Sequence, residues 1–379
     1  MTSELSSLCS YAKGKVSVDT LSKRNYVSTE NMMPNKGGIV DAGALPSAQY
    51  TQQYIKDDIL VSNIRPYFKK IWMADDDGGC SNDVLVFRAD RGCDSTFLYY
   101  ILANDAFFNY ASATSKGTKM PRGDKTAIMQ YKVPCFNYET QLRIGKLLRS
   151  IDDRIAVNKK INDNLQQQLF SLYENMATAS PCLKEYTLSN LCDFQEGYVN
   201  PPQTHPEYFD GEVKWLRAVD INESFIIETS RTLTKAGFES AKKSALLFEP
   251  NTIAISKSGT IGRLGIIADY MCGNRAVINI APHDTNMLAF IYCFLKSKQR
   301  EFPDMAVGSV QKNLYVSLLE PLSVSIPDNE SLTAFNAVGA SILGMIHNNC
   351  VENTDLANLR DTILPKLMSG EIDVSSVLL

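Results

Sequence analysis

The sequence has no long hydrophobic run and few residues of the kinds that bind metals. No stretch approaches the 18 uninterrupted apolar residues typical of a membrane-spanning helix, and the first fifteen residues contain no apolar signal core. Three histidines leave little room for a histidine-based metal site. The nine cysteines include no C-x-x-C pair, so neither a disulfide framework nor a zinc framework is expected. We therefore expect a cytoplasmic globular protein with reduced cysteines and no membrane partner.

The chain also lacks the excess of positive charge that is usual in proteins that wrap nucleic acid. Its 38 basic and 42 acidic residues give a net charge of −4. The charge is uneven, because residues 1–180 contain 22 basic and 19 acidic side chains, whereas residues 181–379 contain 16 and 23. Any contact with DNA is therefore expected to use local positive patches or a basic partner.

An internal repeat covers the whole chain. Similar segments recur at a nearly constant offset of about 190 residues, which indicates two copies of one unit. The matched segments are Leu5–Ser10 with Leu188–Asp193, Ile59–Met73 with Thr252–Ile266, Phe97–Leu102 with Phe290–Leu295, and Gly117-Thr118 with Gly308-Ser309. From Ser150 and Ser341 onward, further identities follow at an offset of 191 without a gap.

Each copy begins with about 140 residues of short apolar runs and ends in one long helix. The short runs predict a mixed α/β domain, with strands at 84–90, 252–256, 276–282 and 322–327 and helices at 97–111 and 288–302. The following helices are predicted at 139 to about 176 and at 330 to about 368. Their apolar residues alternate at spacings of 4 and 3, which is typical of a coiled-coil seam. The proposed seams are Ile144, Leu148, Ile151, Ile155, Asn158, Asn162, Leu165, Leu169 and Leu172, and Phe335, Val338, Ile342, Met345, Asn349, Asn353, Leu356, Ile363 and Leu367.

Both predicted seams contain asparagine at the same two positions, Asn158 and Asn162 in the first copy and Asn349 and Asn353 in the second. Asparagine in a seam lowers stability but selects the register and the partner. We therefore expect the two helices to pair with each other, antiparallel, because two tandem copies would be related by a pseudo-two-fold axis. The fold class expected is α+β, with two mixed α/β domains separated by an antiparallel coiled coil.

This order of domains and helices resembles the specificity subunit of type I restriction–modification systems. The resemblance covers essentially the whole chain. It is carried by Leu147–Leu165, Pro206–Ile221, Ala254–Ile267, Gly308–Pro327 and Ile363–Val374. It implies target recognition domains at 1–138 and 179–329 and spacer helices at 139–178 and 330–379.

The resemblance also implies a function and partners. Such a subunit has no catalytic activity and binds no cofactor. It reads a bipartite, asymmetric site with a fixed gap in double-stranded DNA, and it docks two methyltransferase subunits. Those partners would use S-adenosylmethionine to methylate adenine, and restriction and translocation subunits, if present, would use ATP and Mg²⁺.

Two matched loops contain the candidate DNA-binding residues. Basic side chains on loops can reach phosphates, an arginine can read guanine, and glutamine or asparagine suits adenine. The candidates in the first copy are Arg65, Lys69, Lys70, Lys116, Lys119, Arg122 and Lys125, and those in the second are Lys257, Arg263, Ser309, Gln311, Lys312 and Asn313.

Two other functions compete with this interpretation. Asn200-Pro201-Pro202-Gln203 is similar to the Asn-Pro-Pro-aromatic motif of amino-methyltransferases, so a stand-alone DNA adenine methyltransferase is one alternative. Gln203 cannot stack on a flipped base as an aromatic side chain does, and an ordinary proline-rich turn is the favoured interpretation. Ser256–Arg263 lacks the GKS/T ending of a phosphate loop, so a hairpin turn is expected there. A coiled-coil interaction protein without DNA binding would also satisfy the two long helices.

Overall fold

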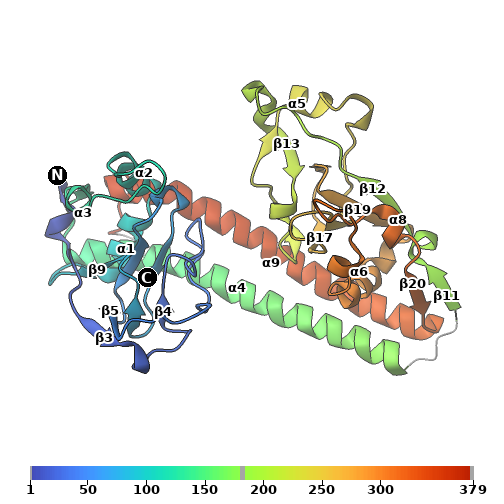
Figure 1. Ribbon diagram of the computed structural model, residues 1–379, viewed down its shortest axis with the longest axis horizontal. Coiled ribbons are helices and arrows are strands. Elements are labelled where there is room, and N and C mark those ends of the chain that lie inside the picture. Colours follow the sequence, from blue (N-terminus) through green and yellow to red (C-terminus); the bar gives the residue numbers. More distant parts are fainter. Residues whose placement is uncertain (1, 180–183, 376–379) are drawn as a thin grey trace. The chain divides into compact units, whose positions relative to one another are not determined.

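The computed structural model describes residues 2–179 and 184–375 (Figure 1). The chain forms two compact units. The first contains Met1–Arg154 and Leu356–Leu379, and the second contains Ile155–Asp355. Each long helix therefore contributes one end to each unit.

The first unit is built on two four-stranded sheets. One has the order β2-β9-β6-β7 and is antiparallel throughout, with strands Cys9–Tyr11, Val84–Ala89, Ile59–Ser62 and Ile71–Met73. The other has the order β3-β5-β8-β4, with strands Lys15–Ser17, Tyr50–Tyr54, Gly78–Cys80 and Tyr26–Val27. A separate pair joins β1 (Thr2–Glu4) to β10 (Lys132–Pro134). Strands β6 and β9 are buried along almost their whole length, because the first sheet packs on helices.

Three short helices accompany these sheets, α1 (Ser95–Ala103), α2 (Asp105–Ala113) and α3 (Lys125–Met129). The single helix predicted for residues 97–111 was wrong, because Asn104 interrupts it. The Asn104 backbone is extended, and its side chain accepts a hydrogen bond from the Ala106 amide as the N-cap of α2.

The second unit repeats this plan. Its main sheet has the order β12-β19-β16-β17-β14, with strands Cys192–Glu196, Val277–Pro282, Ile253–Ser256, Leu264–Ile267 and Phe225–Ile226. A three-stranded sheet has the order β15-β13-β18, with strands Thr232–Leu233, Phe209–Leu216 and Cys272–Gly273. The pair β11 (Lys184–Thr187) and β20 (Ser323–Ile326) corresponds to β1 and β10. The helices are α5 (Lys235–Glu239), α6 (Leu288–Lys298), α7 (Phe302–Met305) and α8 (Val316–Leu319). The helix predicted at 288–302 ends early, at Lys298, and α7 starts with Phe302 and Pro303.

The registers of the two main sheets confirm the internal repeat. Cys9 lies opposite Ala89 in the first unit, and Cys192 lies opposite Pro282 in the second. Ile59 and Phe87 pair in the same way as Ile253 and Ile280, so Ile59 corresponds to Ile253 and the sequence match of Ile59 with Thr252 was wrong by one residue. The predicted hairpin at 256–263 is also present, as the connection between β16 and β17. The two copies therefore share a framework on which loops at equivalent places can be compared.

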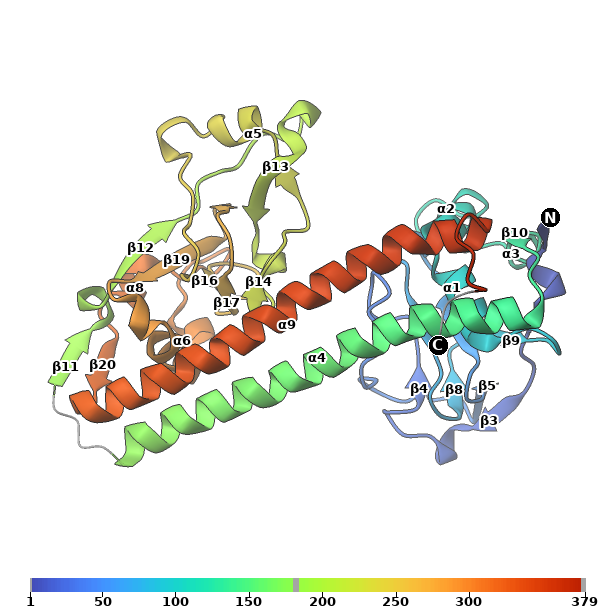
Figure 2. The same ribbon diagram turned by 180° about the vertical axis from the view of Figure 1, so that it is seen from behind.

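The two long helices are α4 (Tyr138–Ala179) and α9 (Asn329–Ser369). They pair antiparallel within each unit. In the second unit the Asn158 amide donates to Asn353 Oδ1 at 3.1 Å, and Asn349 donates to Asn162 Oδ1 at 2.8 Å. In the first unit Arg360 donates to Asp152 Oδ1 at 2.6 Å. Figure 2 shows the two helices from the other side.

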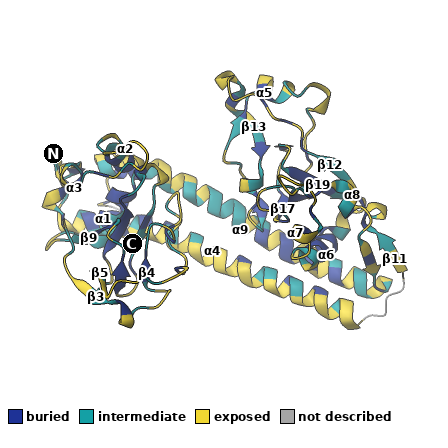
Figure 3. Cartoon of the chain, in the orientation of Figure 1, coloured by how far each residue is buried: buried dark blue, intermediate teal, exposed yellow. Residues whose placement is uncertain are grey.

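Part of the proposed seam was wrong. Val338 and Met345 are about half exposed, and Leu172 is also exposed, whereas Gly339, Ile346 and Tyr173 are buried. The contacting positions before Asn349 are Phe335, Gly339, Ile342 and Ile346. Glycine has no apolar side chain, so a pattern of hydrophobic residues cannot identify a seam position that glycine occupies. Figure 3 shows that exposed residues recur along one face of α4. Among the described residues, no helix is both long and apolar enough to span a bilayer.

Candidate nucleic-acid interface

In the first unit, two loops that contain predicted DNA-binding residues lie against each other. One connects β6 to β7 and includes the short helix η3 (Pro66–Phe68), and the other is a hairpin closed by mutual backbone hydrogen bonds between Lys116 and Arg122, both 2.9 Å. The Arg65 amide donates to the Pro121 carbonyl at 2.8 Å, and the Gly123 amide donates to the Asn63 carbonyl at 3.1 Å. These bonds bring together the segments that contain all seven candidates of the first copy.

The second unit contains the same pair of loops. Val307 and Asn313 close a hairpin with backbone hydrogen bonds of 3.0 and 2.9 Å, and the Leu314 amide joins it to the Lys257 carbonyl of the β16–β17 loop at 2.9 Å. Gly308 has a φ of +141°, and a Cβ there would lie 2.2 Å from the Gln311 carbonyl oxygen. The hairpin therefore requires glycine at its second position, where the first copy has Gly117 at a φ of +96°.

Ion pairs fix several cations of the first loop pair. Lys69 and Lys36 both contact Asp105, at 2.8 and 2.9 Å. Burial would raise the pKa of Asp105, but the hydrogen bonds from Lys69 and Lys36 outweigh it and lower that pKa. The carboxylate therefore stays charged and orients both lysines beside the loop.

The 116–122 hairpin is held in a similar way. Lys116 contacts Asp124 at 2.5 Å, and Arg122 contacts Asp83 at 3.0 Å. The hydrogen bond from Lys116, followed by those from the Ala127 and Thr126 amides, lowers the pKa of Asp124. A DNA phosphate would compete with these carboxylates for the same cations.

Two predicted candidates instead bind within the fold. Lys70 donates to the Thr29 carbonyl at 2.6 Å, and burial lowers its pKa although Glu30 opposes this effect. Lys257 has only 13% of its side chain exposed, contacts Glu196 at 2.9 Å and lies 4.7 Å from the centre of the Tyr315 ring. Both side chains position loops, and neither projects freely.

The other candidates lie at or near the loop surfaces. Arg65 has a left-handed backbone with a φ of 50°, and its buried Nε has no hydrogen-bond partner in the described part of the chain. Asn313 is partly exposed and donates to the Gln311 carbonyl at 3.1 Å. The remaining candidates are exposed, and they are Lys119, Lys125, Arg263, Ser309, Gln311 and Lys312.

Sequence reasoning missed apolar residues at the loop tips. Tyr67 and Phe68 are exposed, with ring centres 4.9 Å apart, and Met120 is exposed on the adjoining hairpin. In the second copy, Val310 is fully exposed at the hairpin tip. Such side chains can stack on bases or wedge between base pairs. The run Pro66-Tyr67-Phe68-Lys69-Lys70, with aromatic residues next to basic ones, was the available signal.

The segment Asn200–Gln203 forms part of the packing of the second unit. Val199 accepts a hydrogen bond from the Trp215 indole at 2.7 Å, Pro201 is buried, and Gln203 accepts one from Arg231 at 2.9 Å. No group of three or more potential metal ligands occurs within residues 2–179 and 184–375.

Comparisons with known proteins agree with this geometry. The family model described as the type I restriction modification DNA specificity domain matches residues 1–167 and again 183–354. The MjaIX specificity subunit of Methanocaldococcus jannaschii is 24% identical over 308 residues, which cover 76% of this chain and 71% of that protein. The HindI specificity subunit of Haemophilus influenzae is 27% identical over 176 residues, 45% of this chain and 38% of that protein.

The fold is also known from a solved structure. The crystal structure of the S subunit of a type I system from M. genitalium matches with a TM-score of 0.57 and 19% identity, over 97% of this chain and 96% of that one. The family model covers most of both halves, and each half contains the same paired loops. The chain therefore belongs to the type I restriction–modification DNA specificity family, as a non-catalytic specificity subunit with one family domain in each half.

Proposed function

We propose that this specificity subunit reads a bipartite DNA site, with one half-site for each pair of loops. The observation that carries the proposal is that one framework presents the same two loops twice, with different side chains. The first hairpin places Lys119 and Arg122 where the second places Val310 and Asn313. Because readout depends on side chains at base edges, the two half-sites differ in sequence.

Each hairpin offers a different chemistry to the bases. Arg122 suits the O6 and N7 acceptors of guanine, whereas Gln311 and Asn313 suit the N6 and N7 groups of adenine. Lysines at the loop surfaces, such as Lys119 and Lys312, bind phosphates and set the position of the loops on the duplex.

The recognition modules of this proposal are residues 1–138 and 179–329, and the helices of 139–178 and 330–379 are the spacer that sets the gap. In this proposal the subunit acts in the cytoplasm and docks two methyltransferase subunits. These partners bind S-adenosylmethionine, and any restriction subunits bind ATP and Mg²⁺, so that this chain needs no cofactor of its own.

The test is methylation-sensitive long-read sequencing of a plasmid from cells that co-express this chain with its methyltransferase subunit. The expected result is methylated adenine in a split motif with two unlike halves and a constant gap. A complex that assembles but methylates no motif and binds all duplexes equally would contradict the proposal. A complex that assembles but leaves all DNA unbound in a gel shift would instead favour a coiled-coil interaction protein without DNA binding.

A further inference from the structure

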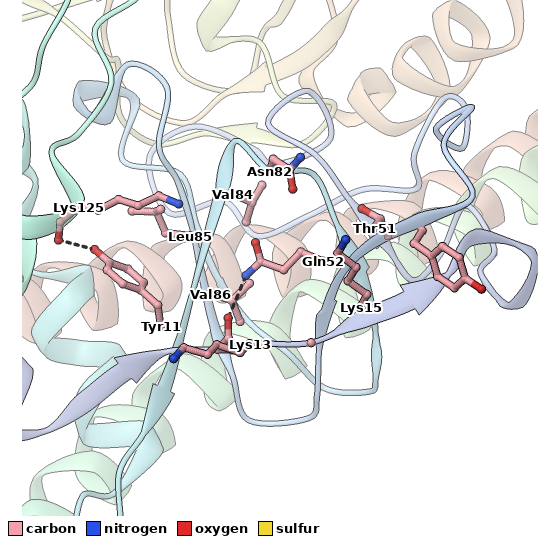
Figure 4. Close-up of a pocket in the computed structure, with 13 residues that line it drawn as sticks. Tyr11, Lys13, Lys15, Thr51, Gln52, Asn82, Val84, Leu85, Val86 and Lys125 are labelled. Carbon is pink, nitrogen blue, oxygen red and sulfur yellow. Dashed lines mark hydrogen bonds between the residues drawn. The ribbon is translucent and has the colours of Figure 1, made fainter.

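A pocket of about 360 Å³ in the first unit contains three lysines. Lys13 lies between β2 and β3, Lys15 begins β3, and Lys125 begins α3 (Figure 4). Lys13 and Lys15 come from one segment and Lys125 comes from another, and all three line the pocket together with Gln52 and Val86. The folded unit therefore lines one pocket with three like charges.

The residues that line this pocket include no acidic group that would compensate its positive charge. No carboxylate lines it, and Lys13, Lys15 and Lys125 form no ion pair with the residues that the structure describes. Lys125 lies 6.0 Å from the centre of the Tyr11 ring, whose hydroxyl donates to the Lys125 carbonyl at 3.0 Å. Asn82 adds a neutral amide at the rim. Three exposed ammonium groups without a counter-charge suit an anion of high charge density, such as a phosphate.

The second unit has a different arrangement at the equivalent place. Because β2 and β12 share their register against β9 and β19, Lys13 corresponds to Glu196. Glu196 contacts Lys257 at 2.9 Å, which cancels the charge of both side chains. Lys125, the first residue of α3, corresponds to Val316, the first residue of α8. The shared fold does not require the three lysines, so they are specific to the first copy.

The pocket is continuous with the candidate interface of the first unit. Asn82 precedes Asp83, whose side chain contacts Arg122 at 3.0 Å. The Asp83 carbonyl accepts a hydrogen bond from the Asn63 amide at 2.8 Å. Lys125 follows Arg122 by three residues. A duplex that contacts the 116–122 hairpin would thus have its backbone near the lysines.

We infer that Lys13, Lys15 and Lys125 bind neighbouring phosphates of the DNA backbone beside the half-site read by the first unit, and that the second unit makes no equivalent contacts. This inference rests on the proposed function and deepens it. It assigns the subunit an asymmetric footprint, with an extra electrostatic anchor on one half-site only.

The experiment uses the assembled complex of this chain with its methyltransferase subunits and a duplex containing the target. Affinity is measured against salt concentration for the wild type, for Lys13→Ala/Lys15→Ala, and for the control Lys23→Ala/Lys56→Ala. The control removes the same charge from exposed positions of the first unit outside the pocket. Loss of two phosphate contacts should reduce the slope of log affinity against log salt by about 1.8. This change corresponds to a loss of affinity of about 60-fold at 0.1 M salt and to almost no loss at 1 M. Discrimination against a mismatched target should be unchanged.

A scan with single neutral methylphosphonates locates the contact. We expect the wild type to lose affinity at positions beside one half-site, and the pocket variant to be insensitive there. A site for free anions would instead leave the scan flat and the slope unchanged, which would overturn the inference. An equal change of slope in the control would overturn it too. A wild-type complex that prefers no sequence would refute the proposed function itself, so the two failures are distinguishable.

Discussion

Gly339 sets the distance between three helices of the second unit. A Cβ built on it would lie 2.6 Å from the Ala289 Cβ on α6 and 3.4 Å from a Leu169 methyl group on α4. Gly339→Ala should therefore lower the free energy of unfolding by about 1–3 kcal/mol, because the helices must separate. The control is Gly344→Ala on the same helix, where a Cβ would meet nothing within 4 Å. It should raise stability by up to about 1 kcal/mol through helix propensity. Equal effects of both substitutions in denaturant unfolding would contradict this account.

Gln311 and Lys312 are neighbours on the second hairpin, and they separate base reading from phosphate binding. Gln311→Ala should cost about 1–3 kcal/mol of binding free energy on the preferred sequence and relax the preference at one base pair. Lys312→Ala should weaken binding to all sequences alike and reduce the salt slope by about 0.9. Binding measured on a panel of duplexes at several salt concentrations distinguishes the two. A change of preference caused by Lys312→Ala would show that the assignment is wrong.

The helix pair contains a polar layer that can be tested at the scale of the element. Asn162 is buried and accepts a hydrogen bond from Asn349 at 2.8 Å. Asn162→Leu alone should cost about 1–3 kcal/mol, because the partly buried Asn349 amide loses its acceptor. Asn162→Leu/Asn349→Leu should recover most of that loss, since both polar groups are then removed. The coupling comes from a double-mutant cycle of unfolding free energies. Additive losses would mean that the two side chains do not act as a pair.

At the scale of the whole molecule, the proposed function implies that the length of the spacer helices determines the gap between the two half-sites. A four-residue insertion beside Ala156 in α4, matched by one beside Asp355 in α9, lengthens both helices by about 6 Å. These positions avoid Gln166, whose amide donates to the Glu223 carbonyl within the second unit. The gap in the methylated motif should widen by one or two base pairs at about 3.4 Å each. Sequencing of the methylated motif measures the gap. An unchanged gap with retained methylation would show that the length of the helices does not determine it.

The fold was predicted mainly from features that lie along the chain. The repeat offset and the 4 and 3 spacing of apolar residues identified the two domains and the two long helices. The predictions failed where a contact has no linear signal. Gly339 replaces Val338 in the seam because its missing side chain lets α6 approach. Asn104 splits a predicted helix because its side chain caps the next one.

The candidate site was predictable to a lesser degree. The amino-acid sequence alone was enough to match the loops of the two copies, because homologous positions keep their order and spacing. The neutralisation of Lys257 by Glu196 and the grouping of Lys13, Lys15 and Lys125 in one pocket arise only in the folded chain. The charge of a surface depends on which side chains meet there, and Glu196 meets Lys257, 61 positions further along the sequence, only when the chain is folded.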